Sequence, residues 1–271
     1  MKSRFQFAFV LALASLLGGI PFACTGQKIP SPPPRIVFII GENEYHTWET
    51  LPEFARTELA DLQCIYCQAS PRPGDNSFTN HLAIRDADLL VVSVRRRTPS
   101  TEMVQLIREY VAKGKPVVGI RTATHAFDAK PTDLDHTNWP SFDRDVFGAN
   151  YQNHYNNTGS NAAATIVRII AAARKESVLN GLDTNDLRFS SSLYRSRELK
   201  PSTTPLLVGH VEGSTESEPV AWLNQAGGRR AFYTSLGSPE DFRNPAFRRL
   251  LKNGILWALE QHLPEVPPTT K

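Results

Sequence analysis

The fold is decided by the stretch Pro116-Val117-Val118-Gly119-Ile120-Arg121-Thr122-Ala123-Thr124-His125. An apolar run ends at Gly119-Ile120, a turn of small residues follows, and a helix is expected to begin directly after it. This order is typical of a nucleophile elbow, in which a sharp turn holds one side chain at the C-terminal end of a buried strand. The side chain at that turn is Arg121, whose protonated guanidinium donates hydrogen bonds but cannot attack a carbonyl group. The stretch therefore predicts an elbow architecture without its nucleophile, and it indicates binding or another kind of chemistry.

Alternating strands and helices are expected on the N-terminal side of this stretch. Continuous apolar runs are typical of strands buried in a parallel sheet. Strands are predicted at residues 36–40, 64–67, 88–94 and 117–120, and helices at 48–62 and 98–113. Thr47 is expected to cap the first helix, while Pro99 and Gly114 mark the first turn and the end of the second. The order predicts an α/β fold with a doubly wound, mainly parallel sheet and helices on both faces.

The C-terminal half adds further strands and a closing helix. Strands are predicted at residues 165–170, 206–211, 219–223 and 230–234, with Ala226-Gly227-Gly228 as a hairpin turn. Asn244 is expected to cap the last helix, with Pro245 at its first position. Residues 128–160 are polar and aromatic without periodicity, and a loop of that length inside a domain is usually functional.

The two ends of the chain differ in composition from the predicted domain. Residues 1–26 have a basic start and a short apolar core, which predicts a signal peptide and export to the periplasm or the extracellular space. Cys24 is the candidate for a lipid anchor, although the residues before it fit a lipobox poorly. Residues 27–35 form a Pro-rich linker, 36–262 the folded domain and 263–271 a flexible tail. No stretch of the mature chain is long and apolar enough for a transmembrane helix.

Charge and cysteine content exclude two classes of function. The formal charge of the chain is +3, and removing Lys2 and Arg4 leaves +1, which together with the absence of a basic stripe argues against a nucleic-acid partner. Cys64 and Cys67 have CxxC spacing, but on a strand residues three apart point to opposite faces. We therefore expect two small apolar side chains in or beside the sheet, and no redox pair or zinc site.

Two blocks of sequence carry a resemblance to a known family. They are Gly119-Ile120-Arg121-Thr122-Ala123-Thr124-His125-Ala126-Phe127 and Phe232-Tyr233-Thr234-Ser235-Leu236-Gly237-Ser238-Pro239-Glu240-Asp241-Phe242. With His46-Thr47-Trp48 near the start and residues 244–259 near the end, they resemble the trehalose-utilisation (ThuA-like) family. The resemblance spans most of residues 36–259 in order, and its C-terminal block is the most specific part.

The resemblance implies a flavodoxin-like fold, similar to that of class I glutamine amidotransferases. Those enzymes use a Cys at the elbow and a later His-Pro-Glu, where this chain has Arg121 and Ser238-Pro239-Glu240. ThuA-like proteins often carry Gly-His-Pro in that block, so Ser238 also departs from the family pattern. The family implies a link to sugar metabolism, and exported relatives look typical of bacteria that degrade polysaccharides. The cofactor and the oligomeric state are left open.

The candidate site lies where parallel strands end, because ligands of open α/β sheets bind outside the C-terminal ends of the strands. Arg121, His125 and Glu240 are the predicted catalytic residues. The predicted substrate-binding residues are Arg95, Glu42, Asn43, His46, Asp128, Tyr151, His154, Tyr155 and Ser238. Neighbouring polar residues are Glu44, Tyr45, Arg96, Arg97, Thr122, Thr124, Ser235 and Asp241. Trp48 is expected to pack against the core instead of binding a sugar ring.

Two readings of these residues stay open. In the first, Arg121 and Arg95 hold a carbohydrate or oxidised sugar while His125 and Glu240 move protons. In the second, the chain is a non-catalytic binding or interaction module, with Arg121 in an internal ion pair with Glu240 or Glu42. A metal site of His46, His125 and His154 shows no recognised ligand spacing and is not predicted. A Cys-dependent reaction is excluded because no cysteine follows an elbow.

Overall fold

The computed structural model describes residues 32–131, 133–159, 161–183 and 187–261. The predicted signal segment with Cys24, residues 27–31 of the linker, residue 262 and the tail 263–271 lie outside the described residues. Within the described ranges, no helix has the length and apolar character needed to cross a membrane.

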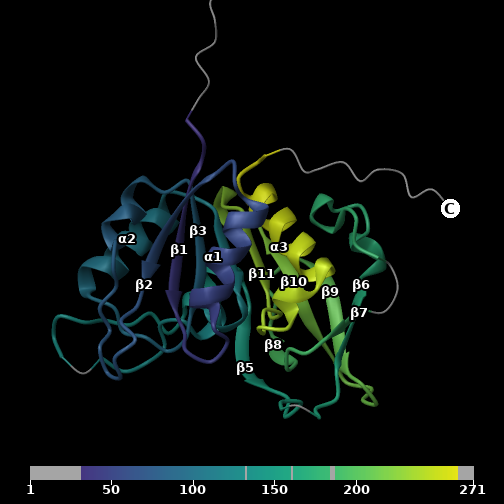
Figure 1. Cartoon of the computed structure of the whole chain (residues 1–271). Coiled ribbons are helices and arrows are strands. Elements are labelled where there is room, and N and C mark those ends of the chain that lie inside the picture. The colour runs from purple at the N-terminus through teal and green to yellow at the C-terminus, as the bar shows by residue number, and fades with distance from the viewer. Residues whose placement is uncertain (1–31, 132, 160, 184–186, 262–271) are drawn as a thin grey trace, which may run out of the picture. The chain divides into compact units, whose positions relative to one another are not determined.

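Nine of the strands in the described part of the chain form one sheet, in the order β2-β1-β3-β4-β11-β10-β9-β6-β7. Its parallel half contains β2 (Gln63–Gln68), β1 (Arg35–Gly41), β3 (Leu89–Val94), β4 (Val117–Ile120) and β11 (Ala231–Thr234). Its antiparallel half contains β10 (Ser217–Asn224), β9 (Thr203–Val211), β6 (Thr165–Ile169) and β7 (Leu187–Phe189). Figure 1 shows this order from β2, β1 and β3 on the left to β10, β9 and β6 on the right. The predicted α/β fold with a largely parallel core is confirmed, and the later strands extend it as a mixed sheet.

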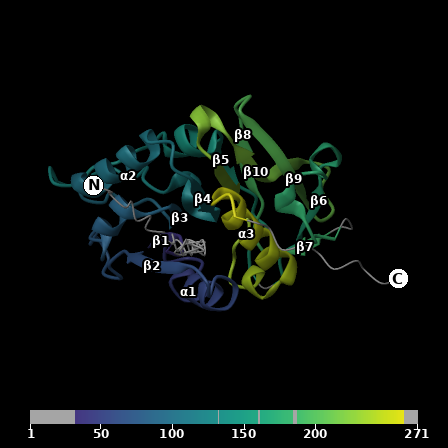
Figure 2. The ribbon, with the colours of Figure 1, turned by 90° about the horizontal axis from the view of Figure 1, so that it is seen from above.

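Helices cover both faces of the sheet, as predicted. Residues of α1 (Thr47–Glu58) and α3 (Pro245–Ala258) belong to one apolar cluster with Ile36, Phe38 and Ile40 of β1. Residues of α2 (Thr101–Ala112) belong to a second cluster with Val37 and Ile39. The alternation along β1 thus distributes its side chains between two cores, and Figure 2 shows α2 on the opposite side of the strands from α1 and α3.

The first two helices begin and end differently from the prediction. The residue that caps α1 is His46, in a left-handed backbone conformation with φ 54°, and the helix ends at Glu58 instead of residue 62. The residue that caps α2 is Ser100, whose side chain accepts a hydrogen bond from Met103 N. Helix α2 therefore begins at Thr101 and not at residue 98, since a Ser side chain is a better cap than the residues before it. The closing helix is as predicted: Asn244 accepts from Ala246 N, and Pro245 is the first residue.

Residues 128–160 are not one long irregular loop, which corrects the prediction. They contain a π-helical turn at Asp143–Phe147 and the strand β5 (Asn150–His154), which pairs with β8 (Tyr194–Arg197) in a second, two-stranded sheet. The strands β5 and β8 are not predicted because they lack an apolar alternation, and β7 is not predicted because it has only three residues. The ring of Phe147 fills the space beside Gly119, where a Cβ atom would lie 2.3 Å from its Cζ. Gly119 thus allows the segment to pack over β4.

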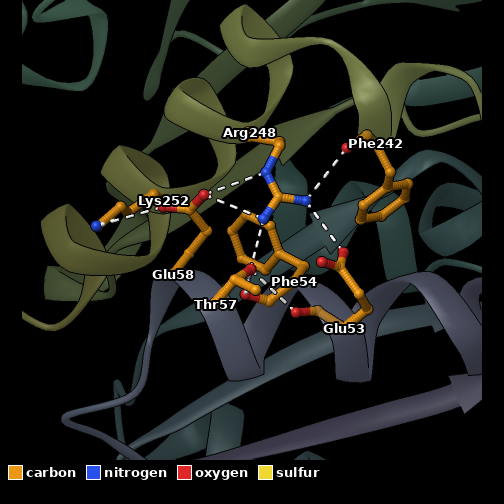
Figure 3. A network of polar contacts seen from close by, with 7 residues as sticks. All are labelled: Glu53, Phe54, Thr57, Glu58, Phe242, Arg248 and Lys252. Carbon is orange, nitrogen blue, oxygen red and sulfur yellow. Dashed lines mark hydrogen bonds and ion pairs between the residues drawn. The ribbon is translucent and has the colours of Figure 1, made fainter.

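The helices α1 and α3 are joined by a polar network around Arg248 (Figure 3). The Arg248 guanidinium donates to Glu58 Oε1 at 3.1 Å and to Glu53 Oε2 at 3.1 Å. It also donates to Thr57 Oγ1 at 2.5 Å and to the carbonyl oxygen of Phe242 at 3.2 Å. All partners except Phe242 lie on α1, so this side chain fixes the position of one helix against the other.

The two cysteines have the placement that the sequence predicts. Cys67 is buried in the core beneath α2, whereas Cys64 packs against the core of the other face. Burial raises the pKa of Cys64 to about 11 and that of Cys67 to about 12. Both thiols are therefore protonated at neutral pH, and they point to opposite faces, as a redox pair cannot.

Candidate functional site

The turn after β4 has the sharp geometry of an elbow. Arg121 follows β4 with φ 46°, in the left-handed region that favours glycine, and begins a short 3-10 turn at Arg121–His125. A non-glycine residue in this region is uncommon and costs roughly 1 kcal/mol or more, so the surrounding contacts must hold it there. The predicted turn is confirmed, but the helix expected after it is only this short turn.

The side chain of Arg121 points into the protein. It is 1% exposed, and its guanidinium lies over the rings of Tyr45 at 4.1 Å and Tyr194 at 4.7 Å. Nη1 donates to the carbonyl oxygen of Ser235 at 2.8 Å, and Nη2 donates to Ser192 Oγ at 2.8 Å. Cation–π contacts and hydrogen bonds therefore replace hydration of this charge.

The internal ion pair of Arg121 that the second reading includes does not form. Among the described residues, no ion pair joins it to Glu240 or to Glu42. Glu42 instead stabilises its own loop and the start of α1: its carboxylate accepts from Tyr45 N at 2.6 Å, Thr47 N at 2.8 Å and Thr47 Oγ1 at 2.6 Å. With both oxygens occupied and only 2% of the residue exposed, Glu42 is a structural acceptor in this arrangement.

His125 is buried beside the elbow. It is 5% exposed, and its ring stacks on Tyr151 with 4.3 Å between the ring centres. Burial, together with the positive charges of Arg96, Arg95 and Arg121, lowers the pKa of His125 to about 3. At neutral pH the imidazole is uncharged, so it offers one hydrogen-bond donor and one acceptor.

Three consecutive arginines follow β3 and line a depression of about 650 Å³. Arg95 Nε lies 2.9 Å from Glu44 Oε2, while Arg96 Nε lies 3.9 Å from Asp128 Oδ2. Arg97 donates to the carbonyl oxygens of Gly41 and Asp75 and to Asn43 Oδ1. The lining residues are Gly41, Asn43, Glu44, Pro73, Gly74, Asn76, Arg95, Arg96 and Arg97. The predicted residues Arg95 and Asn43 thus share one open depression.

Of the predicted binding residues Tyr151, His154 and Tyr155, only the first two lie near His125. Tyr151 stacks on it, and His154 lies close enough to contribute to its low pKa. The hydroxyl of Tyr155, in contrast, donates to Glu216 Oε2 at 2.8 Å and to Glu218 Oε1 at 3.1 Å. Tyr155 therefore fastens the β5–β8 region to the segment around β10 and is not placed beside the imidazole.

The corner after β11 separates Glu240 from the elbow. Glu240 is exposed and lines a depression of about 740 Å³ together with His46, Arg243 and Arg248. No hydrogen bond or ion pair connects Glu240 with His125 among the described residues. The predicted proton-moving pair is not brought together, because α1 and the segment after β11 hold Glu240 at another surface.

The buried carboxylate of this corner is Asp241, one residue later. It is 1% exposed and accepts hydrogen bonds from Gly237 N at 2.9 Å, Ser238 N at 3.2 Å and the hydroxyl of Ser191. Ser238 is buried, and its Oγ has no hydrogen-bond partner. A Gly-Ser turn shortly before an acid is the sequence signal for this arrangement. Ser191, Ser192 and Tyr194 carry no such signal, since the tertiary fold brings their segment to the elbow.

His46 lines the depression of Glu240 and not the one that contains Arg95. His46 stacks on Trp48 with 4.7 Å between ring centres, and Trp48 is 36% exposed, so it is not the packed side chain that the sequence predicts. Within the described part of the chain, no group of three or more His, Cys, Asp and Glu side chains could hold a metal ion. The three histidines considered as ligands do not form such a group.

Comparisons with known proteins agree with this fold. The ThuA family, described as trehalose utilisation, matches residues 44–258. A ThuA-like protein from Parabacteroides merdae is 17% identical, with a TM-score of 0.62 over 87% of this chain and 94% of that one. One from Bacteroides uniformis is 14% identical, with a TM-score of 0.58 over 84% and 93%.

A further structural relative is Agd3, a carbohydrate deacetylase, which is 13% identical with a TM-score of 0.52. The match covers 84% of this chain but 32% of that one, and at this identity it shows the shared fold alone. No curated protein matches the sequence. The family match spans far more than half of the chain and contains both signature blocks, so this protein belongs to the trehalose utilisation (ThuA) family.

Proposed function

We propose that this protein is exported and binds a carbohydrate or an oxidised sugar at the C-terminal ends of β3 and β4. The observation that carries the proposal is the stack of His125 on Tyr151 beside the exposed Arg95 and Arg96. An aromatic surface next to several hydrogen-bond donors suits a hydroxyl-rich ligand. The family's link with trehalose utilisation and the fold shared with a carbohydrate deacetylase support a sugar.

The chemistry of the site favours binding over proton abstraction. A general base is most effective when its pKa lies near the working pH, whereas the pKa of His125 is about 3. The neutral imidazole is buried and instead supports the half-buried ring of Tyr151 from below. Arg95, Arg96 and Asn43 supply further donors from the neighbouring loops.

The second candidate function is a non-catalytic sugar-binding module. The buried Arg121 favours it, because the elbow side chain is directed into the protein and its guanidinium is held by Ser192 and Ser235. The two candidates differ in one result only. An enzyme changes the sugar that it binds, and a module releases it unchanged.

A calorimetric titration of the chain from Gln27 onward tests the proposal. The ligands are mono- and disaccharides and their keto and acid derivatives, and Tyr151→Ala is compared with Arg188→Gln, a charge removal at the β7 edge of the sheet. We expect a sugar that binds the parent chain and the control equally but Tyr151→Ala more weakly. Equal binding to all three proteins would place the site elsewhere. Proton NMR of the bound sugar over hours then separates turnover from binding.

Export has its own test. Intact mass and N-terminal sequencing of the protein recovered from a bacterial host show whether the first 26 residues are removed. A mature chain that begins at a lipidated Cys24 supports an anchor, and an uncut chain contradicts export.

A further inference from the structure

The arginine depression after β3 contains an excess of positive charge. Its lining has three arginines and a single carboxylate, Glu44. Glu44 pairs with Arg95, so Arg96 and Arg97 have no carboxylate partner within the lining. Asp128 lies outside the lining at 3.9 Å from Arg96 Nε, and Asp75, also outside it, lies close enough to Arg97 to favour its charged form. The lining itself still presents more positive than negative charge to an anion.

The three guanidinium groups are held to different degrees. Arg97 is fixed by neutral acceptors, two carbonyl oxygens and the amide oxygen of Asn43, which keep its charge in place without neutralising it. Arg96 is the most exposed, with 56% of its side chain accessible, and its backbone has φ 48°. Its backbone N donates to the carbonyl oxygen of His125 at 2.9 Å, which ties this turn to the elbow. The Arg97 guanidinium is thus held in position before a ligand binds, whereas the exposed Arg96 guanidinium can move toward the ligand.

A second depression, of about 400 Å³, adjoins the first along the loop after β1. Gly41 and Asn43 line both of them. The second is lined further by Trp48, Gln68 and Pro71, so it combines an indole ring with two side-chain amides. His46 covers one face of that indole, which holds the ring in a fixed orientation. A rigid aromatic surface with amide groups around it suits a sugar ring.

We propose that the ligand is an anionic sugar, whose acid group lies among Arg95, Arg96 and Arg97 and whose adjoining ring lies against Trp48. This inference rests on the proposed sugar binding at the end of β3 and names the class of the sugar. It extends the sugar from the arginines toward Trp48, and Tyr151 lines neither depression. The acid group is a carboxylate, as in a uronic acid, or a phosphate ester, because a guanidinium recognises both through paired hydrogen bonds. Asn43 lines both depressions, and its side-chain amide donates to the part of the sugar between the acid group and the ring against Trp48.

The test is a set of calorimetric titrations with glucose, glucuronate, glucose 6-phosphate and a disaccharide that contains glucuronate. The proteins are the parent chain, Arg96→Gln, Trp48→Ala and the control Arg188→Gln, whose charge lies at the far edge of the sheet. Arg96 makes one long ion pair and Trp48 is exposed, so neither substitution is expected to prevent folding. Circular dichroism verifies this for each variant.

We expect an acid sugar to bind the parent chain at least about tenfold more tightly than glucose, and this preference to shrink with added salt. Arg96→Gln should remove most of the preference, Trp48→Ala should weaken the disaccharide more than the monosaccharide, and the control should change neither. The tighter of the two acids identifies the acid group.

Other outcomes overturn one proposal or the other. Equal affinity for glucose and the acids, or full preference in Arg96→Gln, overturns this inference and leaves sugar binding intact. Equal weakening of both sugars by Trp48→Ala overturns the position of the adjoining ring. A parent chain that binds none of the sugars, neutral or acidic, overturns the proposed function together with the inference.

Discussion

His125 makes the stability of this protein depend on pH in a predictable direction. Its pKa is about 3 in the folded chain, against an ordinary value of 6.5, because burial and the neighbouring arginines disfavour the charged ring. Between these two values the unfolded chain carries the additional proton. Stability therefore falls as the pH falls below 6.5, and the loss ends near pH 3.

The size of the effect follows from the difference between the pKa of His125 in the folded chain and its ordinary value. Each pKa unit corresponds to about 1.36 kcal/mol, so lowering the pH from 7.5 to 5 costs about 2 kcal/mol at this one residue. In a fold of this size that is about 4 to 8 °C in the melting temperature. The substitution His125→Phe keeps a ring to stack on Tyr151 but removes the titration. We expect the stability of the parent chain relative to this variant to fall by about 2 kcal/mol over that range.

Urea unfolding at a series of pH values measures the difference directly. A matched control is His210→Phe, which removes a half-buried histidine on β9. The reasoning requires that His125→Phe changes the pH dependence of the unfolding free energy more than His210→Phe does. If the parent chain and His125→Phe lose stability in parallel from pH 7.5 to 5, or if the His125 ring titrates near 6.5 by NMR, the burial argument is refuted.

Three further substitutions test the packing and charge of the fold. Gly119→Ala should lower stability by about 1 to 3 kcal/mol in urea unfolding, because the new Cβ would overlap the Phe147 ring. Arg248→Met should cost roughly 1 to 3 kcal/mol in the same assay, since α3 keeps only the Lys252–Glu58 bond to α1, whereas substitution of its exposed neighbour, Arg249→Met, should cost little. Burial raises the pKa of Asp143 to about 6, so its contribution to stability is present at low pH and is lost as the pH rises through 6. The parent chain should therefore lose about 2.5 kcal/mol relative to Asp143→Asn between pH 4 and 7, and a constant difference would contradict this.

The parts of the fold that could be predicted are those with a local signal. Val117–Ile120 reads as a buried strand, and the apolar runs of β1 and β3 read likewise, because both faces of these strands are covered. The hairpin at Ala226–Gly228 follows from glycines, and both Gly227 and Gly228 have positive φ. The end of α1 at Glu58 has no comparable signal in the sequence.

The candidate site was harder to predict because its side chains meet through tertiary contacts. The sequence places Arg121 at an elbow correctly, but only the fold shows that Ser192 and Tyr194, from a segment without apolar alternation, receive its guanidinium. Glu240 and Asp241 are adjacent in the sequence, so the motif predicts the region of the site. The geometry of the short turn decides which of the two carboxylates is buried.

The inward direction of Arg121 also bears on how the family could change. A single substitution to Cys at this position would not yield an amidotransferase, because it would leave a cavity between two aromatic rings and leave Ser192 Oγ and the Ser235 carbonyl oxygen without their donor. A thiol nucleophile at this position would therefore require compensating changes at Ser192, Tyr45 and Tyr194 as well.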